Sequence, residues 1–181
     1  MPNSLYDNFV NDFSKVMCDL ADNRQYSNII FLCIGTDRIT GDSFGPLVGY
    51  KLNSYFADAD RINIIGDLSN PVTSNNIISI SNQIRENYTN PFIVAVDSAL
   101  DNAQNVGNII VSEGPLSLGT SIKRTYIDVG HMNIKGIVAE NTSSAANNFC
   151  VLQNTSLNLV MNLANVVSRG IYNTINYEVD V

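Results

Sequence analysis

Two aspartates stand next to apolar segments and could carry acid–base chemistry. Asp42 ends the polar segment 36–42, which follows the apolar run 28–34, and Asp97 directly follows the apolar run 92–96. Two carboxyl groups that lie close together cannot both ionise cheaply, so the pair holds one proton and one of the two pKa values rises. Such a pair can activate water and protonate a leaving amine. Alternatively, it can bind a divalent cation that polarises the substrate.

Each of these aspartates also has a purely structural interpretation. Asp42 precedes Ser43 at the start of an expected helix, where an N-cap contributes about 1 kcal/mol. Asp97 could cap a turn that opens at Ser98 and Ala99. The functional interpretation gains weight when both are considered, because the carboxyl ends of parallel strands meet at one edge of a sheet. The sequence therefore predicts Asp42 and Asp97 as the catalytic pair.

The loop before Asp42 is the predicted substrate-binding segment. Residues 35–45 contain three glycines between a strand and a helix, an arrangement that could cradle an anion. The pattern is neither GxGxxG nor a Walker A motif, since no GK[ST] follows. Asp37 and Asp42 would also repel a phosphate group. We therefore expect Gly35, Thr36 and Asp37 to contact a substrate that is not a nucleotide.

Two further residues are candidates for the same site. His131 is the only histidine of the chain, and one histidine beside two aspartates is a common ligand set for zinc or nickel. An ordinary hydrogen-bonded histidine is the alternative. Lys123 could stabilise an oxyanion or bind a substrate carboxylate, or it could be a solvated surface lysine. Catalysis by a serine or cysteine nucleophile is not expected, because Cys33 lies inside a strand and Cys150 has no visible activating partner.

The elements that must position these residues alternate between strand and helix. Helical spacing of apolar residues predicts helices over 5–20, 43–56, 71–88 and 149–169, the last ended by Gly170. Apolar runs predict strands over 28–34, 61–65, 92–96 and 108–111, with a short edge strand over 126–129, a loop over 114–123 and no clear assignment for 134–138. This alternation predicts a mostly parallel α/β sheet.

Length, composition and charge limit the class of protein. The 181 residues are 45% hydrophobic and fit one α/β domain over 1–181, with 1–27 as a helical segment before the core. The net charge of −7 argues against a nucleic-acid partner, which needs a basic face. No apolar run approaches the roughly 20 residues of a membrane span, and no signal peptide is apparent. Three separated cysteines do not suggest a disulfide framework, so we expect a cytoplasmic protein. The N-terminal helix could pack on the core or support a homo-oligomer.

Several segments resemble the YyaC family of sporulation proteins. The similarity covers most of the chain, from about residue 28 to residue 170. It is carried by the segments CIGTDR at 33–38, TGDSFGPLVG at 40–49, AVDS at 95–98, GPL at 114–116 and VLQNTSLNLVM at 151–161.

That family resembles the germination protease of bacterial spores and, more distantly, the hydrogenase maturation proteases. The implied fold is a phosphorylase/hydrolase-like three-layer α/β/α sandwich. The germination protease uses two aspartates as its catalytic pair, and the segments at 40–46 and 94–97 place them at Asp42 and Asp97. The maturation proteases carry an acid at each of these places and a downstream histidine, which implies His131 as a third metal ligand. The lysine-bearing loop after the fourth strand implies a substrate-side role for Lys123.

The sequence also departs from these proteases. Gly41 stands where the germination protease has proline, and the long extra segments of that enzyme are missing, so its substrate does not carry over. The resemblance implies a sporulation-associated peptidase that acts on a protein or peptide in the mother cell or forespore. The alternatives are a maturation-type protease that depends on zinc or nickel, and a non-catalytic sporulation binding protein. Neither a nucleic acid nor a membrane is expected as a partner.

Overall fold

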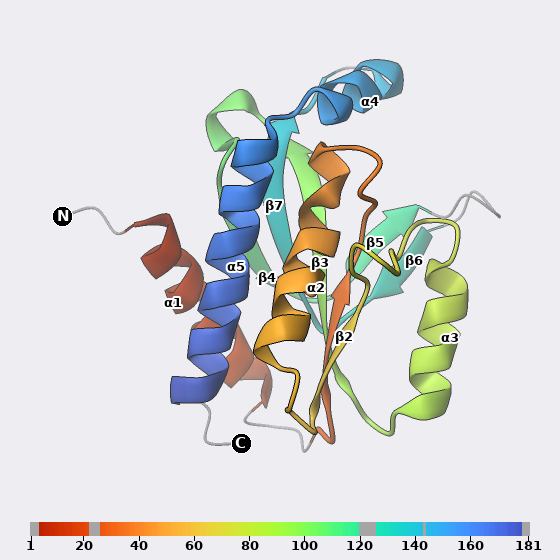
Figure 1. Ribbon diagram of the computed structural model, residues 1–181, viewed down its shortest axis with the longest axis vertical. Coiled ribbons are helices and arrows are strands. Elements are labelled where there is room, and N and C mark those ends of the chain that lie inside the picture. Colours follow the sequence, from red (N-terminus) through yellow and green to blue (C-terminus); the bar gives the residue numbers. More distant parts are fainter. Residues whose placement is uncertain (1–3, 22–25, 120–125, 143, 179–181) are drawn as a thin grey trace.

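A computed structural model describes residues 4–21, 26–119, 126–142 and 144–178 of the chain. Its centre is a five-stranded sheet in the order β2-β1-β3-β7-β4 (Figure 1). The strands are β1 (Ile29–Cys33), β2 (Ile62–Ile65), β3 (Phe92–Asp101), β4 (Ile109–Glu113) and β7 (Met132–Glu140). Four strands run parallel, and only β4 is antiparallel to its neighbour β7. Helices flank the sheet, so the protein has the expected three-layer α/β/α fold with a mostly parallel sheet.

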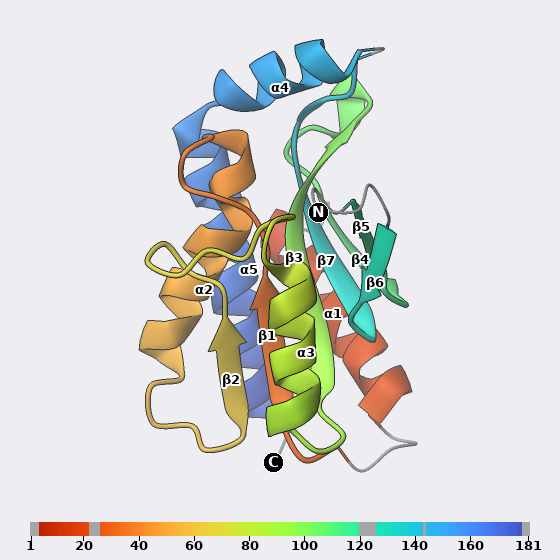
Figure 2. The same ribbon diagram turned by 90° about the vertical axis from the view of Figure 1, so that its right-hand side faces the viewer.

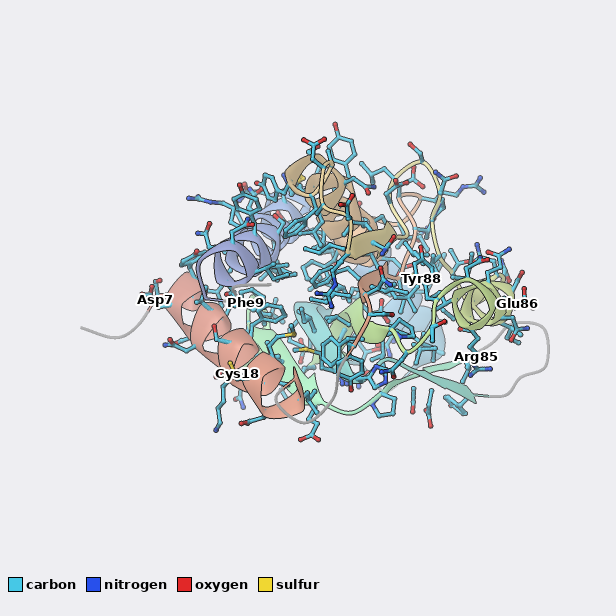
Figure 3. The ribbon with its side chains drawn as sticks, turned by 90° about the horizontal axis from the view of Figure 1, so that it is seen from below. Asp7, Phe9, Cys18, Arg85, Glu86 and Tyr88 are labelled. Atoms are coloured by element: carbon cyan, nitrogen blue, oxygen red, sulfur yellow. The ribbon has the colours of Figure 1, made fainter. Side chains whose placement is uncertain are left out.

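One face of the sheet is covered by α1 (Leu5–Ala21), α2 (Phe44–Tyr55) and α5 (Leu157–Glu178). The N-terminal helix α1 is part of the hydrophobic core, because its side chains Phe9, Phe13 and Met17 are buried in that core. Their spacing of four residues places them on one side of the helix. Figure 3 shows Phe9 directed into the molecule and Asp7 directed away from it.

The opposite face is covered by α3 (Ile77–Asn87) and by a two-stranded ribbon of β5 (Leu116–Gly119) and β6 (Tyr126–Val129). Figure 1 shows these elements on the other side of the sheet from α1 and α5, and Figure 2 shows that side facing the viewer. Ile30, Leu32 and Ala95 of the sheet are buried beneath them. Because both faces of the sheet are covered, side chains of β1 and β3 are buried on both faces, and the sequences of these strands are continuous apolar runs.

The ribbon is the outer half of a long bent hairpin. One antiparallel register continues from the sheet into the ribbon. It pairs Ile109 with Gly136 in the sheet and Leu116 with Val129 in the ribbon. The bend lies at two glycines with positive φ, Gly114 (+94°) and Gly130 (+92°), values that other residues rarely adopt. The expected loop over 114–123 is therefore wrong for residues 116–119, and the unassigned segment 134–138 belongs to a central strand.

The long helix expected over 149–169 is two helices, α4 (Ala145–Gln153) and α5. Side chains after α4 replace its missing helical hydrogen bonds: Asn154 Nδ2 donates to Cys150 O (2.8 Å) and Thr155 Oγ1 donates to Val151 O (2.9 Å). Gly170 does not end α5 but lies within it. A Cβ there would meet the ring of Phe9 at 2.5 Å, so this glycine allows α1 to pack closely.

Two other boundaries differ in ways that matter for the site. Helix α3 begins at Ile77 rather than at 71, because Asn76 Oδ1 accepts a hydrogen bond from Thr73 N (2.7 Å) and Asn76 Nδ2 donates to Pro71 O (3.0 Å). Residues 71–76 therefore form a loop. Strand β3 runs on to Asp101, so Asp97 lies within the strand rather than after it.

Among the described helices, none combines the length and apolar character that a membrane span requires.

Candidate active site

The structure brings Asp42 and Asp97 to the same place. Strand β1 ends at Cys33, paired with Val96, so Asp97 is the first residue of β3 beyond the end of β1. Asp42 lies in the short 3-10 helix η1 (Gly41–Ser43), which follows the loop after β1. Ser98 connects the two carboxyl groups: its N–H donates to Asp97 Oδ1 (2.8 Å), and its hydroxyl donates to Asp42 Oδ1 (3.5 Å).

Backbone hydrogen bonds fix the loop that carries Asp42. The N–H of Thr36 donates to Asp42 O (3.0 Å), and the N–H of Asp42 donates to Ile39 O (3.0 Å). Helix α2 begins at Phe44, preceded by Ser43, whose hydroxyl donates to Thr40 O (2.7 Å). No side chain caps the start of this helix. The Asp42 carboxylate is therefore not used as the N-cap that its position in the sequence allowed.

A cavity of about 630 Å³ opens beside the two aspartates at the carboxyl ends of the parallel strands. Its walls come from the loop after β1, the loop 71–76 before α3, and the β5 residues Leu118 and Gly119. Gly35 and Thr36 line the cavity, together with Arg38. Asp37 is exposed and is not part of the cavity wall. Lys123 lies outside the described residues.

Burial gives both aspartates unusual protonation behaviour. The partial burial of Asp42 raises its pKa to about 6, although hydrogen bonds from Ser98 and Thr36 oppose the rise. Burial raises the pKa of Asp97 well above the ordinary value, and the negative charge of Asp42 raises it further. The backbone hydrogen bond from Ser98 and the positive charge of Lys135 act in the opposite direction on Asp97. At neutral pH this favours a pair in which Asp97 is protonated and Asp42 is ionised.

Lys135 is a site residue that the sequence analysis missed. It lies in β7 directly opposite Asp97 in a parallel register, and such partners project from the same face of a sheet. A single lysine between the apolar residues Ile134 and Ile137 is the sequence signal that could have drawn attention to it. That signal could not name its partner, because the strand assignment of 134–138 was open. Ser98 was considered only as part of a turn.

His131 does not join the aspartates. Its backbone N–H donates to Ile93 O (2.7 Å), and its Nδ1 accepts from Ile93 N (3.0 Å). Its ring stacks on Phe92 and meets Tyr26 edge-on, with ring centroids 5.5 Å away in both cases. Ile93 and Asp97 are separated along β3 by roughly 13 Å of extended strand. Because His131 is bonded to Ile93, it lies at the opposite end of the sheet from the aspartates.

The expected metal ligand set of Asp42, Asp97 and His131 is therefore not formed. Within the described ranges, no three side chains of His, Cys, Asp or Glu converge as metal ligands. Cys33 is buried beneath α2, and burial raises the pKa of its thiol. Its neutral thiol is consistent with a core residue rather than a nucleophile.

Fold and site together define an α/β protein with a partly buried aspartate pair at the carboxyl end of a parallel sheet. The chain belongs to the family described as "Protein of unknown function (DUF1256)", whose model matches residues 3–170. It is 45% identical over 143 residues to the "Uncharacterized protein YyaC" of Bacillus subtilis (strain 168), a match that covers 79% of this chain and 67% of that protein. The YyaC resemblance expected from the sequence motifs is thus confirmed.

Proposed function

We propose that this protein is a peptidase in which Asp42 and Asp97 act together on a peptide bond. The observation that carries the proposal is the pair itself: two carboxyl groups linked through Ser98, beside a cavity, with raised pKa values. Carboxyl pairs that share one proton can act as acid and base in a single reaction.

The difference between the two environments assigns the roles. Asp42 is ionised above its pKa of about 6, so it serves as the general base. Asp97, whose pKa is raised further by burial and by the charge of Asp42, serves as the general acid. Groups with pKa values displaced toward the working pH are suited to proton transfer.

The reaction then balances without another reactant. Asp42 takes a proton from water as the water oxygen bonds to the carbonyl carbon, and Asp97 gives its proton to the carbonyl oxygen. The resulting tetrahedral diol collapses as its nitrogen is protonated by Asp42, the C–N bond breaks, and one hydroxyl proton returns to Asp97. The products are a carboxylic acid and an amine, and both aspartates regain their starting states.

The cavity suits a polypeptide segment. Its volume of about 630 Å³ lies within the usual range of ligand pockets, roughly 300–1,000 Å³. Thr73, Asn75 and Asn76 supply uncharged polar groups, whereas Ile34 and Leu118 supply apolar surface. Mixed walls of this kind can accept both the backbone and the side chains of a peptide. A role in sporulation, in the mother cell or forespore, belongs to this proposal through the motif resemblance.

A peptide-library assay tests the proposal. Purified protein is incubated with unstructured peptides of varied sequence, and new termini are identified by mass spectrometry. We expect cleavage by the wild type and a loss of about 10²–10⁴-fold in Asp42→Asn and Asp97→Asn, the usual contribution of an acid or base. Asp37→Asn is the matched control, because Asp37 is an exposed aspartate of the same loop.

The outcomes separate the alternatives. Cleavage that persists in both site variants would contradict the aspartate mechanism. Cleavage abolished by a chelator and restored by zinc or nickel would favour the metal-dependent alternative. Stable peptide capture without cleavage, unchanged in both variants, would favour the non-catalytic binding protein.

A further inference from the structure

The ribbon that borders the aspartate cavity has an unusual position in the fold. Beyond the bend of the hairpin, β5 pairs with β6 alone, as a separate two-stranded sheet. Leu118 and Gly119 of β5 line the cavity that Asp42 and Asp97 also line, whereas no residue of β6 does. The two edges of the ribbon are therefore not equivalent, and only β5 borders the candidate active site.

The register identifies the backbone groups that β5 leaves unpaired. Ser117 and Asp128 are register partners whose side chains form a hydrogen bond, the close side-chain contact that is typical of a non-hydrogen-bonded backbone pair. In an antiparallel ladder such pairs alternate with hydrogen-bonded pairs. Leu116 and Leu118, which continue the same register, therefore direct their N–H and C=O groups to β6. Ser117 and Gly119, which alternate with these two leucines along β5, direct their N–H and C=O groups away from β6.

The edge of β5 is also sterically accessible. Ser117 and Gly119 are both exposed, and across the described residues no strand pairs with this edge. A Cβ placed on Gly119 would meet no atom within 4 Å. An incoming chain can therefore approach the backbone of β5 closely at the border of the cavity.

We propose that the free edge of β5 binds an extended segment of the polypeptide substrate by adding it as a third strand to the ribbon, which directs its backbone past the aspartates. This inference rests on the proposed peptidase function and names how that site recognises its substrate class. Main-chain hydrogen bonds to an exposed edge provide affinity for extended chains of varied sequence. Every second side chain of the bound substrate segment points into the cavity beside Leu118. The apolar surface of Leu118 favours apolar substrate residues at that position.

Charge selects the occupant. Two copies of this chain, each with a net charge of −7, repel one another, so self-pairing along β5 is disfavoured relative to a neutral or basic peptide. The negative charge of Asp42 in the same cavity likewise disfavours an acidic occupant. The predicted substrate segment is thus extended, free of proline at its pairing positions, and not acidic.

Proline substitution on the two edges of the ribbon provides a matched test. Ser117 and Asp128 face each other across the ribbon and share a side-chain hydrogen bond, so both Ser117→Pro and Asp128→Pro lose that bond. Each variant also removes one outward N–H, but only Ser117→Pro removes it from β5. Proline is tolerated at sheet edges, and circular dichroism with thermal unfolding checks that both variants fold alike.

Binding is measured by fluorescence polarisation with labelled neutral and basic 12-residue peptides, in the Asp97→Asn background to prevent cleavage. We expect Ser117→Pro to weaken binding at least about tenfold, the equivalent of one well-made hydrogen bond. Asp128→Pro should bind within about twofold of the Asp97→Asn parent. In the active background, kcat/KM for peptide cleavage should fall in Ser117→Pro but not in Asp128→Pro.

Three results would overturn the inference. Equal peptide affinity in the two proline variants, with cleavage still dependent on the aspartates, would remove β5 docking and leave the peptidase proposal standing. A wild-type dimer that Ser117→Pro dissociates, without peptide binding, would make a second copy of the chain the occupant. Cleavage that does not depend on Asp42 or Asp97 would remove the proposed function on which the inference rests.

Discussion

At Asp42 and Asp97, the burial that raises the pKa of both carboxyl groups also opposes folding at high pH. A carboxyl group that is withdrawn from water resists ionisation, and its partner's negative charge adds to the resistance. The same displacement of pKa that keeps a proton on Asp97 at neutral pH therefore lowers the stability of the folded state when that proton leaves. Reactivity and stability can be tested separately at these two residues.

The pH dependence of stability follows from the sign of the shift. Both pKa values are raised in the folded protein, so the folded state binds protons more tightly than the unfolded state. Near pH 4 and below, the penalty is absent because both carboxyls are protonated in the folded state. As the pH rises through the folded pKa values, stability is lost. Asp97→Asn removes this ionisation and should raise the free energy of unfolding at about pH 8 by on the order of 1–3 kcal/mol.

Urea unfolding of wild type and Asp97→Asn at about pH 4 and about pH 8 checks this prediction. The difference between the two proteins should be small at the lower pH and clear at the higher one. Asp37→Asn, at an exposed position of the same loop, is the control and should show no such trend. A stability difference for Asp97→Asn that shrinks as the pH rises would contradict the assignment.

Lys135 should set the upper pH limit of activity. Its positive charge lowers the pKa of Asp97, so Lys135→Met should raise that pKa and move the alkaline limb of the kcat profile to higher pH. A merely structural lysine would change the amplitude of the profile without moving that limb. Lys15→Met, on the exposed side of α1, is the control. An unmoved alkaline limb in Lys135→Met would show that the lysine does not act on Asp97.

At the scale of elements, η1 and α4 hold each other in place next to Asp42. A Cβ on Gly41 would lie 2.7 Å from Leu152 Cδ2 and 3.0 Å from Leu152 O, so α4 can pack here only against glycine. This close packing gives a physical reason for the glycine at position 41. Because Gly41 directly precedes Asp42, displacement of α4 would also disturb the aspartate.

Gly41→Ala should therefore destabilise the protein by about 1–3 kcal/mol, the usual range for overpacking a tight contact. Chemical denaturation measures the effect. Gly119→Ala is the matched control for stability, since an added Cβ there meets no atom within 4 Å. Equal stability of the two alanine variants would mean that η1 and α4 do not depend on this contact.

The elements differ in how far local sequence determines them. Strands β1 and β3 are apolar runs that could be predicted from the sequence, because full burial on both faces leaves a strong local signal. Strand β5 was missed because Gly114, Pro115 and Ser117 are typical of loops, and it forms only through pairing with β6. The break between α4 and α5 was missed because apolar residues continue at helical spacing on both sides of it.

The candidate site shows the same division. Asp97 could be predicted because it is the first polar residue after an apolar run, and Asp42 because it stands between the polar loop after β1 and the start of α2. Lys135 and the loop 71–76 enter the site only through strand order and tertiary contacts, which one sequence does not specify. His131 was assigned to the metal set from its residue type and from the resemblance to the maturation proteases, and its place at the far end of the sheet follows from the direction of β7.

For the molecule as a whole, α1 is part of the folding unit that supports the site. Phe13 is fully buried between α1 and the rest of the core, so Phe13→Ala should lower the free energy of unfolding by about 3–5 kcal/mol. Phe149→Ala is the control, because Phe149 is 49% exposed on α4, and its loss should be less than about 1 kcal/mol. Denaturant titrations of both variants would contradict this account if the two losses were equal.

We propose that Asp42 and Asp97 act as one catalytic unit, a claim that a comparison with the double variant can test. Rates of peptide cleavage are measured for wild type, Asp42→Asn, Asp97→Asn and the double variant. Residues that act as a unit are strongly non-additive, so the double variant should be about as slow as either single variant, each reduced by about 10²–10⁴-fold. Losses that multiply in the double variant, or single variants that cleave at the wild-type rate, would contradict the claim.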